Sequence, residues 1–134
     1  MKPVELEPGG TEVILLVEDE DTLRNFVRAY LESEGYSVLE AGNEQEAMEI
    51  CRSYDGPIHV LITDIVMPGL GGVELARAAL KLRPTLAVIF VSGCGHRQLD
   101  TNAIGRGHFL PKPFSFDTLA RTVRSLLDKN DESA

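Results

Sequence analysis

The sequence predicts an α/β fold in which helices cover both faces of a parallel β-sheet. Three continuous apolar runs, at residues 13–17, 60–62 and 86–91, have the length and composition of strands buried on both faces. Segments with apolar residues at helical spacing lie between these runs and after them. Strands that alternate with helices are typical of parallel sheets, because a parallel neighbour requires a crossover connection.

Length and composition fit one domain at 12–128, between a leader and a short tail. The chain has 134 residues, 43% of them hydrophobic, which is enough for a sizeable core. Residues 1–11 carry two prolines and two glycines and are interpreted as a flexible leader or linker. Residues 129–134 are polar and form the tail.

Charge and hydropathy exclude several classes of function. A net charge of −8 argues against nucleic-acid binding. No apolar stretch approaches the roughly 20 residues of a membrane-spanning helix, and the N-terminus lacks a signal-peptide pattern. We therefore expect a cytoplasmic location. The two cysteines, Cys51 and Cys94, provide no disulfide framework.

Two strand–helix units make up the first half of the chain. The strand at 13–17 precedes a helix that ends at Gly35, and a strand at 37–41 precedes a second helix with Asn43 as its N-cap. Cys51 lies in the apolar stripe of the second helix, so we interpret it as a core residue rather than a reactive thiol. The two stripes consist of Leu23, Phe26, Val27, Tyr30 and Leu31, and of Ala47, Ile50, Cys51 and Tyr54.

The central strand ends at Asp64, because Pro68 and Gly69 prevent its continuation. Residues 69–72 are interpreted as a flexible glycine-rich turn. The helix after this turn ends at Arg83-Pro84. Its inward stripe consists of Val73, Ala76, Ala79 and Leu80.

The last third of the chain has a weaker pattern. The strand at 86–91 leads into a stretch punctuated by glycine, in which any helix, at 97–104, would be short and of low propensity. A short strand at 108–110 follows. Ser115 is the expected cap of a last helix, whose stripe is Leu119, Val123, Leu126 and Leu127.

Four of the five predicted strands end in polar side chains. Glu18 and Asp19 follow the first strand, Asp64 ends the third, Ser92 the fourth, and Lys112 follows the fifth. Ligands bind at the carboxyl ends of the strands in open α/β sheets. We therefore expect these side chains to converge on one site.

Three carboxylates in one site favour a hard divalent cation. Two unit charges 4 Å apart repel by about 4 kcal/mol at an effective dielectric constant near 20, and a cation removes this cost. Oxygen ligands without nearby histidine or cysteine favour Mg²⁺ over Zn²⁺. An aspartate can attack phosphorus to form an aspartyl phosphate, whose oxygens Lys112 and the Ser92 hydroxyl would neutralise.

Each feature also has a structural interpretation. Asp64 taken alone is a turn-forming residue at a strand end. Acids near the start of the first helix complement its dipole, which does not explain why Glu18 and Asp19 follow the strand directly. We interpret His59 as a packed or surface residue rather than a phosphodonor.

Four motifs, in this order and at domain spacing, resemble the response-regulator receiver domain of bacterial two-component systems. They are Leu15–Glu20 (LLVEDE), Thr63–Gly69 (TDIVMPG), Val91–Gly93 (VSG) and Leu110–Phe114 (LPKPF). The resemblance covers residues 12–128. It implies a flavodoxin-like (βα)5 doubly wound sheet with strand order 2-1-3-4-5. The leader and the segment around Asp64 further resemble C-terminal receivers of hybrid sensor histidine kinases.

The resemblance assigns the metal site and the phosphoacceptor. It implies that Asp64 accepts the phosphoryl group and that Asp19 binds Mg²⁺ directly. Glu18 would bind the ion mostly through water, and Val66 would offer its backbone carbonyl. Glu18 stands where the family more often has aspartate.

The same resemblance implies the switch. Ser92 would be the switch hydroxyl, Lys112 the lysine that contacts the phosphoryl group, and Phe109 the switch aromatic. The Lys112–Pro113 bond would be cis, a state of about 5–6% of such bonds.

The function implied is that of a phosphorelay switch. A histidine kinase or a histidine phosphotransfer domain would donate to Asp64, and the domain would catalyse only its own phosphotransfer and autodephosphorylation. An output domain or target would bind the face of the fourth helix, fifth strand and fifth helix of such a fold. We expect a monomer or a phosphorylation-dependent dimer, with no direct nucleic-acid binding or membrane insertion, although the full-length protein could be tethered to a membrane sensor kinase.

Two alternatives remain. One is a pseudo-receiver that binds partners without phosphorylation, against which the complete set of site residues argues. The other is an Mg²⁺-dependent phosphatase or phosphotransferase with an aspartate nucleophile, similar to the haloacid dehalogenase group. Such enzymes have a second aspartate where this chain has Val66.

Overall fold

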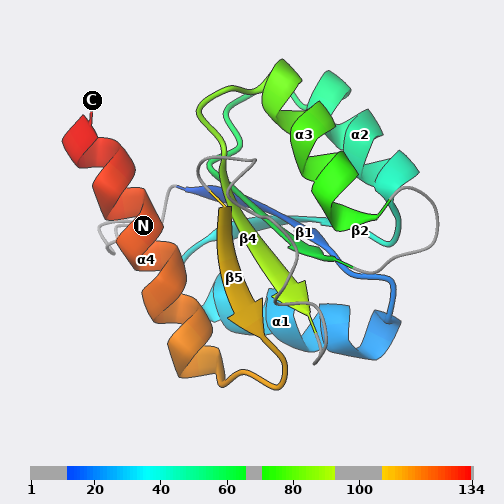
Figure 1. Ribbon diagram of the computed structural model, residues 1–134. Helices are drawn as coiled ribbons and strands as arrows, with labels where there is room; N and C mark the ends of the chain where they lie inside the picture. The colour runs from blue at the N-terminus through cyan, green and yellow to red at the C-terminus, as the bar shows by residue number, and fades with distance from the viewer. Residues whose placement is uncertain (1–11, 66–70, 93–106, 134) are drawn as a thin grey trace, which may run out of the picture.

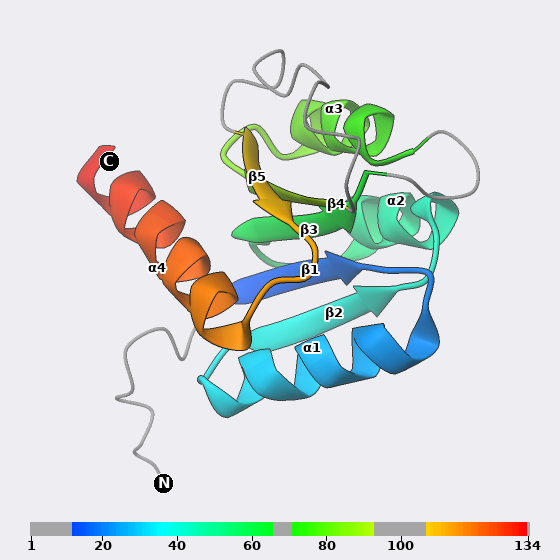
Figure 2. The same cartoon turned by 60° about the horizontal axis from the view of Figure 1, so that its bottom comes forward.

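The computed structural model describes residues 12–65, 71–92 and 107–133. They form a five-stranded parallel sheet with the order β2-β1-β3-β4-β5, and Figure 2 shows the strands side by side. The strands are β1 (Val13–Val17), β2 (Ser37–Ala41), β3 (Val60–Asp64), β4 (Ala87–Ser92) and β5 (Gly107–Pro111). The predicted fold class and strand order are confirmed.

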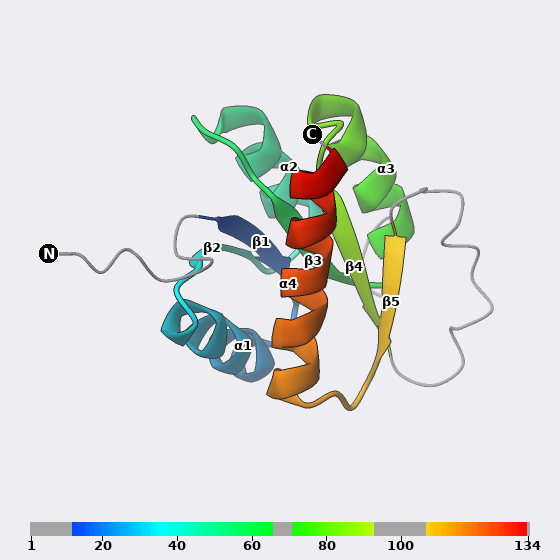
Figure 3. The ribbon, with the colours of Figure 1, turned by 90° about the vertical axis from the view of Figure 1, so that its left-hand side faces the viewer.

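Helices cover both faces of the sheet. Helices α2 (Glu44–Ser53) and α3 (Gly72–Leu82) lie together on one face (Figure 1). Helices α1 (Asp21–Ser33) and α4 (Phe116–Ser133) cover the other face, as the turned view in Figure 3 shows. The polar tail from residue 129 to 133 continues α4 as a helix. None of the helices in these described ranges is long and apolar enough to span a membrane.

The two faces enclose two separate cores. Alternate residues of β1 illustrate the division, because Leu15 packs toward α2 and α3 whereas Ile14 packs toward α1 and α4. Both side chains are fully buried, as are Leu61 of β3 and Ile89 of β4. Burial on both faces explains why the central strands are continuous apolar runs without polar alternation.

Local sequence signals place several helix ends where they were predicted. Asn43 caps α2 by accepting a hydrogen bond from the Glu46 N–H at 2.8 Å. Ser115 Oγ accepts from the Thr118 N–H at 3.0 Å at the start of α4. Gly35, at φ 102°, follows the end of α1, where its N–H and that of Tyr36 bond back to carbonyls of the last turn in a Schellman motif. The helix predicted at 97–104 lies outside the described residues.

His59 and Cys51 have structural surroundings. The His59 backbone N–H donates to the Val13 carbonyl at 2.8 Å, and its Nδ1 accepts from the Val13 N–H at 3.0 Å. The histidine therefore extends the β1–β3 pairing at the end of the sheet opposite the polar strand ends. Cys51 is buried in the core beneath α2, and this burial raises the pKa of its thiol, as expected for a packing residue.

Candidate functional site

The carboxyl ends of β1 and β3 bring three acidic side chains together. Glu18 and Asp19 follow β1, and Asp64 is the last residue of β3, which pairs with β1 through Val17 and Thr63. One carboxylate oxygen from each of the three acids lies within 4.8 Å of the others. The Glu18 and Asp64 side chains are only 8% and 11% exposed, whereas Asp19 is exposed. The predicted convergence of these acids is confirmed.

Lys112 completes this cluster from the end of β5. Its Nζ lies 2.9 Å from Asp64 Oδ2 and 3.5 Å from Glu18 Oε1. Burial lowers the pKa of Lys112, but the hydrogen bond to Asp64 and the charge of Glu18 outweigh that effect, so the net direction is upward. One ammonium group thus partly compensates the two buried carboxylates.

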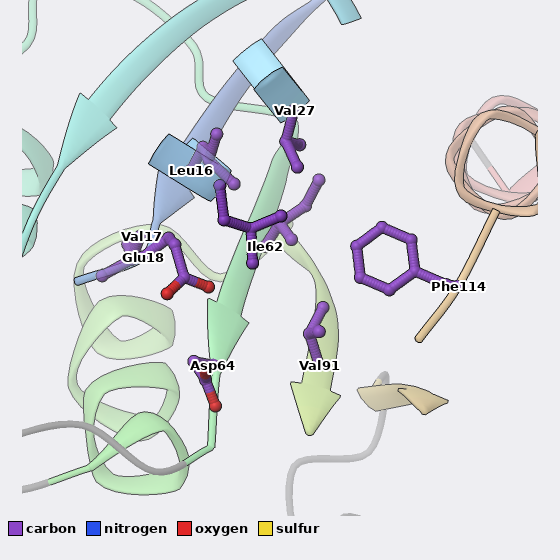
Figure 4. A pocket seen from close by; sticks show the side chains of 9 residues that line it. Leu16, Val17, Glu18, Val27, Ile62, Asp64, Val91 and Phe114 are labelled. Atoms are coloured by element: carbon purple, nitrogen blue, oxygen red, sulfur yellow. The ribbon is translucent and has the colours of Figure 1, made fainter. Parts of the chain in front are cut away.

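Glu18 is held in an environment that disfavours its charge. Burial raises the pKa of Glu18, and the hydrogen bond from the Glu20 N–H to Glu18 Oε2, at 3.0 Å, together with Lys112, only partly opposes this. In Figure 4, Glu18 and Asp64 border a small pocket whose other labelled side chains are apolar. Its remaining lining residues are Leu16, Val17, Leu23, Val27, Ile62, Val91 and Phe114.

The donor set fits a hard divalent cation. The cluster offers carboxylate oxygens alone, and oxygen-only sets suit Mg²⁺ or Ca²⁺ better than softer metals. Repulsion among the three carboxylates, which one ammonium group does not cancel, would be relieved by a cation. The described residues therefore include a site that could hold a metal ion.

The other predicted site residues are described only in part. The backbone of Ser92 ends β4 beside Pro111, but its side chain and the whole of Val66 lie outside what the structure describes. Phe109 is half-buried in β5 and packs against the core beneath α2 and α3. The Lys112–Pro113 bond is cis, as the resemblance implied.

Sequence reasoning missed the role of Gly72 at this site. A Cβ atom on Gly72 would lie 2.2 Å from the Asp64 carbonyl oxygen, so the first residue of α3 lies directly against the end of β3. The Gly72 N–H donates to the Ile65 carbonyl at 2.9 Å. The consecutive glycines Gly71 and Gly72, at the N-cap and first position of α3, are a signal of such close approach, whereas the sequence pattern predicts only a turn.

Replacing Glu18 with glutamine is expected to stabilise the metal-free protein at neutral pH. Burial raises the pKa of Glu18 above its ordinary value of 4.5, so the folded state binds this proton more tightly than the unfolded chain does. The wild type therefore loses stability as pH rises from 4.5 through the raised pKa. Urea unfolding in EDTA at about pH 4.5 and about pH 7.5 measures the difference, which should be larger at the higher pH. A larger difference at the lower pH would contradict this assignment.

Comparison with known proteins places the chain in a family. The sequence model of the family described as response regulator receiver domain matches residues 14–124 of this chain. The chain is 43% identical over 126 residues to the sensor kinase CckA of Brucella abortus, covering 92% of this chain but only 13% of that protein. It is 37% identical over 116 residues to the response regulator receiver protein CpdR of the same organism, covering 85% of this chain and 95% of CpdR.

Solved structures agree with these relatives. A receiver domain protein from Clostridium thermocellum has a TM-score of 0.83 at 29% identity, over 92% of this chain and 99% of that one. The receiver domain of the hybrid histidine kinase CckA has a TM-score of 0.74 at 36% identity, over 86% and 98%. The family match over most of the chain, with its acidic cluster at the strand ends, shows that the chain belongs to the response regulator receiver domains, the phosphoacceptor modules of two-component signalling.

Proposed function

We propose that Asp64 accepts a phosphoryl group from a phosphohistidine while Mg²⁺ is bound by Glu18, Asp19 and Asp64. The observation that carries this proposal is the position of Lys112 Nζ, 2.9 Å from the Asp64 carboxylate, beside two further acids whose oxygens lie within 4.8 Å. Lys112 offers a fixed positive charge at the reacting carboxylate, and the acids offer the oxygen ligands that Mg²⁺ prefers.

The transfer is a substitution at phosphorus. A carboxylate oxygen of Asp64 forms a new O–P bond, the N–P bond of the phosphoimidazole breaks, and the released imidazole nitrogen takes up a proton. A Mg²⁺ ion held by Glu18, Asp19 and Asp64 would supply positive charge to neutralise the phosphoryl oxygens. Lys112 would stabilise the same charge from the end of β5. We propose that the Ser92 hydroxyl contacts the phosphoryl group and that the Val66 backbone carbonyl binds the ion, as the resemblance implies.

Phosphorylation replaces one negative charge at Asp64 by nearly two. We propose that Ser92 and Phe109 respond to this charge, so that the surface around β5 and α4 shifts between two states. Such a shift is limited by the difference in interaction of the phosphoryl group with the two states.

The proposed donors are a histidine kinase or a histidine phosphotransfer domain, and the proposed readers are an output domain or a target protein. The chain spans a small part of the CckA relative and half of the ArcA relative from Escherichia coli, but nearly all of CpdR. The activities of these longer relatives are therefore not assigned to this chain. We propose that the domain catalyses only its own phosphotransfer and autodephosphorylation. We further propose that it acts in the cytoplasm and that it is a monomer or a phosphorylation-dependent dimer.

Acetyl phosphate with Mg²⁺ tests the acceptor. We expect the wild type to form a phosphoprotein on a Phos-tag gel and in intact-mass spectra, and Asp64→Asn to form none. Asp55→Asn, which alters an exposed aspartate in the loop after α2, is the matched control and should behave like the wild type. EDTA should abolish the adduct. An equal adduct on Asp64→Asn, or none on the wild type, would refute the proposal, and partner binding unchanged by Asp64→Ala would favour the phosphorylation-independent alternative.

A further inference from the structure

Arg24, in the second turn of α1, connects three segments around the acidic cluster. Its Nη1 donates to the Glu18 backbone carbonyl at 2.8 Å and its Nη2 to Asp21 Oδ1 at 2.7 Å. Its Nε donates to Glu40 Oε1, on the neighbouring strand β2, at 3.3 Å. The arginine side chain is only 18% exposed, so these contacts are made in a largely enclosed position.

The contact with the Glu18 carbonyl acts on the peptide that joins two of the acids. The N–H of Glu18 donates to the Ala41 carbonyl at 3.1 Å, and its carbonyl accepts from Arg24. The Glu18 side chain is further held by the Glu20 N–H and by Lys112. The exposed Asp19 has no such burial to place it. The carbonyl that Arg24 binds belongs to the Glu18–Asp19 peptide, so this contact constrains the backbone from which Asp19 extends.

Two residues beside Arg24, Gly42 and Glu40, leave room for its side chain and bind it. A Cβ atom on Gly42 would lie 3.3 Å from Arg24 Nη1, so the turn after β2 leaves space for the guanidinium group. The Gly42 N–H is held by Glu46 Oε1 at 2.7 Å. Glu40, which binds Arg24, also lies 3.0 Å from Arg28 Nε through its other oxygen. Glu40, one of the acceptors of Arg24, is thereby itself held by a second arginine.

A cation beside a metal site would by its charge alone weaken metal binding. Asp21 and Glu40 compensate the charge of Arg24, which leaves the directed hydrogen bond to the Glu18 carbonyl as its distinctive contribution. We propose that Arg24 is a positioning residue that preorganises Glu18 and Asp19 for a divalent cation and so sets the metal affinity of the site. This inference rests on the proposed function, because it concerns the same cation.

If Arg24 served only as a salt bridge between α1 and β2, its replacement would affect stability and metal affinity differently. Exposed or half-exposed ion pairs add little to stability and would leave metal affinity unchanged. Outer contacts that orient metal ligands instead change affinity, by about 10–100-fold. Metal affinity and stability, measured separately, distinguish the two roles.

The test measures the Mg²⁺ dissociation constant by ¹⁵N NMR titration, following the amides of residues 18–20. We expect Arg24→Met to weaken Mg²⁺ binding about tenfold. Arg24→Lys should recover only part of this loss, because one ammonium group cannot reach three acceptors in a fork. Glu40→Gln is the matched control, since it removes the charge partner on β2 and keeps the Glu18 contact. Its loss of affinity should be much smaller than that of Arg24→Met.

A structural signature accompanies the affinity. In metal-free protein, the amide of Glu20, which donates to Glu18 Oε2, should shift in Arg24→Met and not in Glu40→Gln. Wild-type affinity in Arg24→Met, or an equal loss of affinity in Glu40→Gln, would overturn the inference. A wild type that binds no Mg²⁺ and forms no phosphoprotein would instead refute the proposed function itself.

Discussion

Replacing Lys112 with methionine is expected to slow phosphorylation of Asp64 about a hundredfold, the loss found when one preorganised donor to a developing charge is removed. Methionine keeps the unbranched apolar stem and deletes the ammonium group. Lys112 Nζ lies 2.9 Å from Asp64 Oδ2, at the carboxylate where phosphoryl charge would develop. Adduct formation from acetyl phosphate, followed over time in saturating Mg²⁺, measures the effect.

The same substitution should also reduce the stability of the metal-free protein. Removing one partner of a fully buried ion pair costs about 3–5 kcal/mol. The Lys112 side chain is 27% exposed, and solvent screens it, so we expect about 1–2 kcal/mol. Mg²⁺ should restore part of this stability in Lys112→Met, because the cation relieves the repulsion between Glu18 and Asp64.

Lys112→Arg is the control that retains the positive charge. Its planar guanidinium group has a different reach and geometry, so phosphorylation should remain slow while the metal-free stability recovers. A Lys112→Met variant that forms the phosphoprotein as fast as the wild type would show that Lys112 serves only to compensate the acids.

Gly72→Ala is expected to destabilise the protein by about 3 kcal/mol, at the upper end of the usual cost of overpacking. The added Cβ would lie 2.2 Å from the Asp64 carbonyl oxygen and 3.0 Å from the Ile65 Cα, and both are backbone atoms that cannot rotate away. Intrinsic propensity has the opposite sign, because alanine favours a helix over glycine by about 1 kcal/mol. A loss of stability therefore reports the steric contact between α3 and β3.

The relief of this contact should also displace Asp64. Moving the end of β3 lengthens the 2.9 Å contact between Asp64 and Lys112, so phosphorylation should slow even in molecules that remain folded. Gly56→Ala is the matched control, because its nearest neighbour, at 3.3 Å, is the Tyr54 ring rather than backbone. Urea unfolding and the phosphorylation rate of both variants test this. Wild-type stability in Gly72→Ala would mean that α3 has room to move away.

Many elements of the fold were predictable because their signals are local. The apolar run at 13–17 forms β1, and Asn43 and Ser115 cap the helices whose N-termini were predicted there. A strand buried on both faces must be apolar throughout, and a helix N-terminus needs a side-chain acceptor, wherever it lies in the fold. The order of the strands came from the resemblance of the motifs rather than from the pattern.

The candidate site was predictable as a set of residues and not as a geometry. Polar residues at strand ends identified Glu18, Asp19, Asp64 and Lys112, because parallel strands bring their carboxyl ends to one edge. The 2.9 Å contact between Asp64 and Lys112 joins residues 48 positions apart, so it depends on the register of three strands. The burial that raises the pKa of Glu18 likewise arises only when several elements pack together, and the apolar residues that line the adjacent pocket come from β1, α1, β3 and β4 and from the segment before α4.

The sequence by itself determined the alternation of strands and helices, the two-sided core and the chemical identity of the acidic edge. Only the tertiary structure decided that Gly72 lies against the carbonyl of Asp64 and that Arg24 donates a hydrogen bond to the carbonyl of Glu18. Periodicity shows which face a side chain occupies, but it carries no information on how closely two backbones approach. That distance is determined by the packing of helices on the sheet, which involves the whole chain at once.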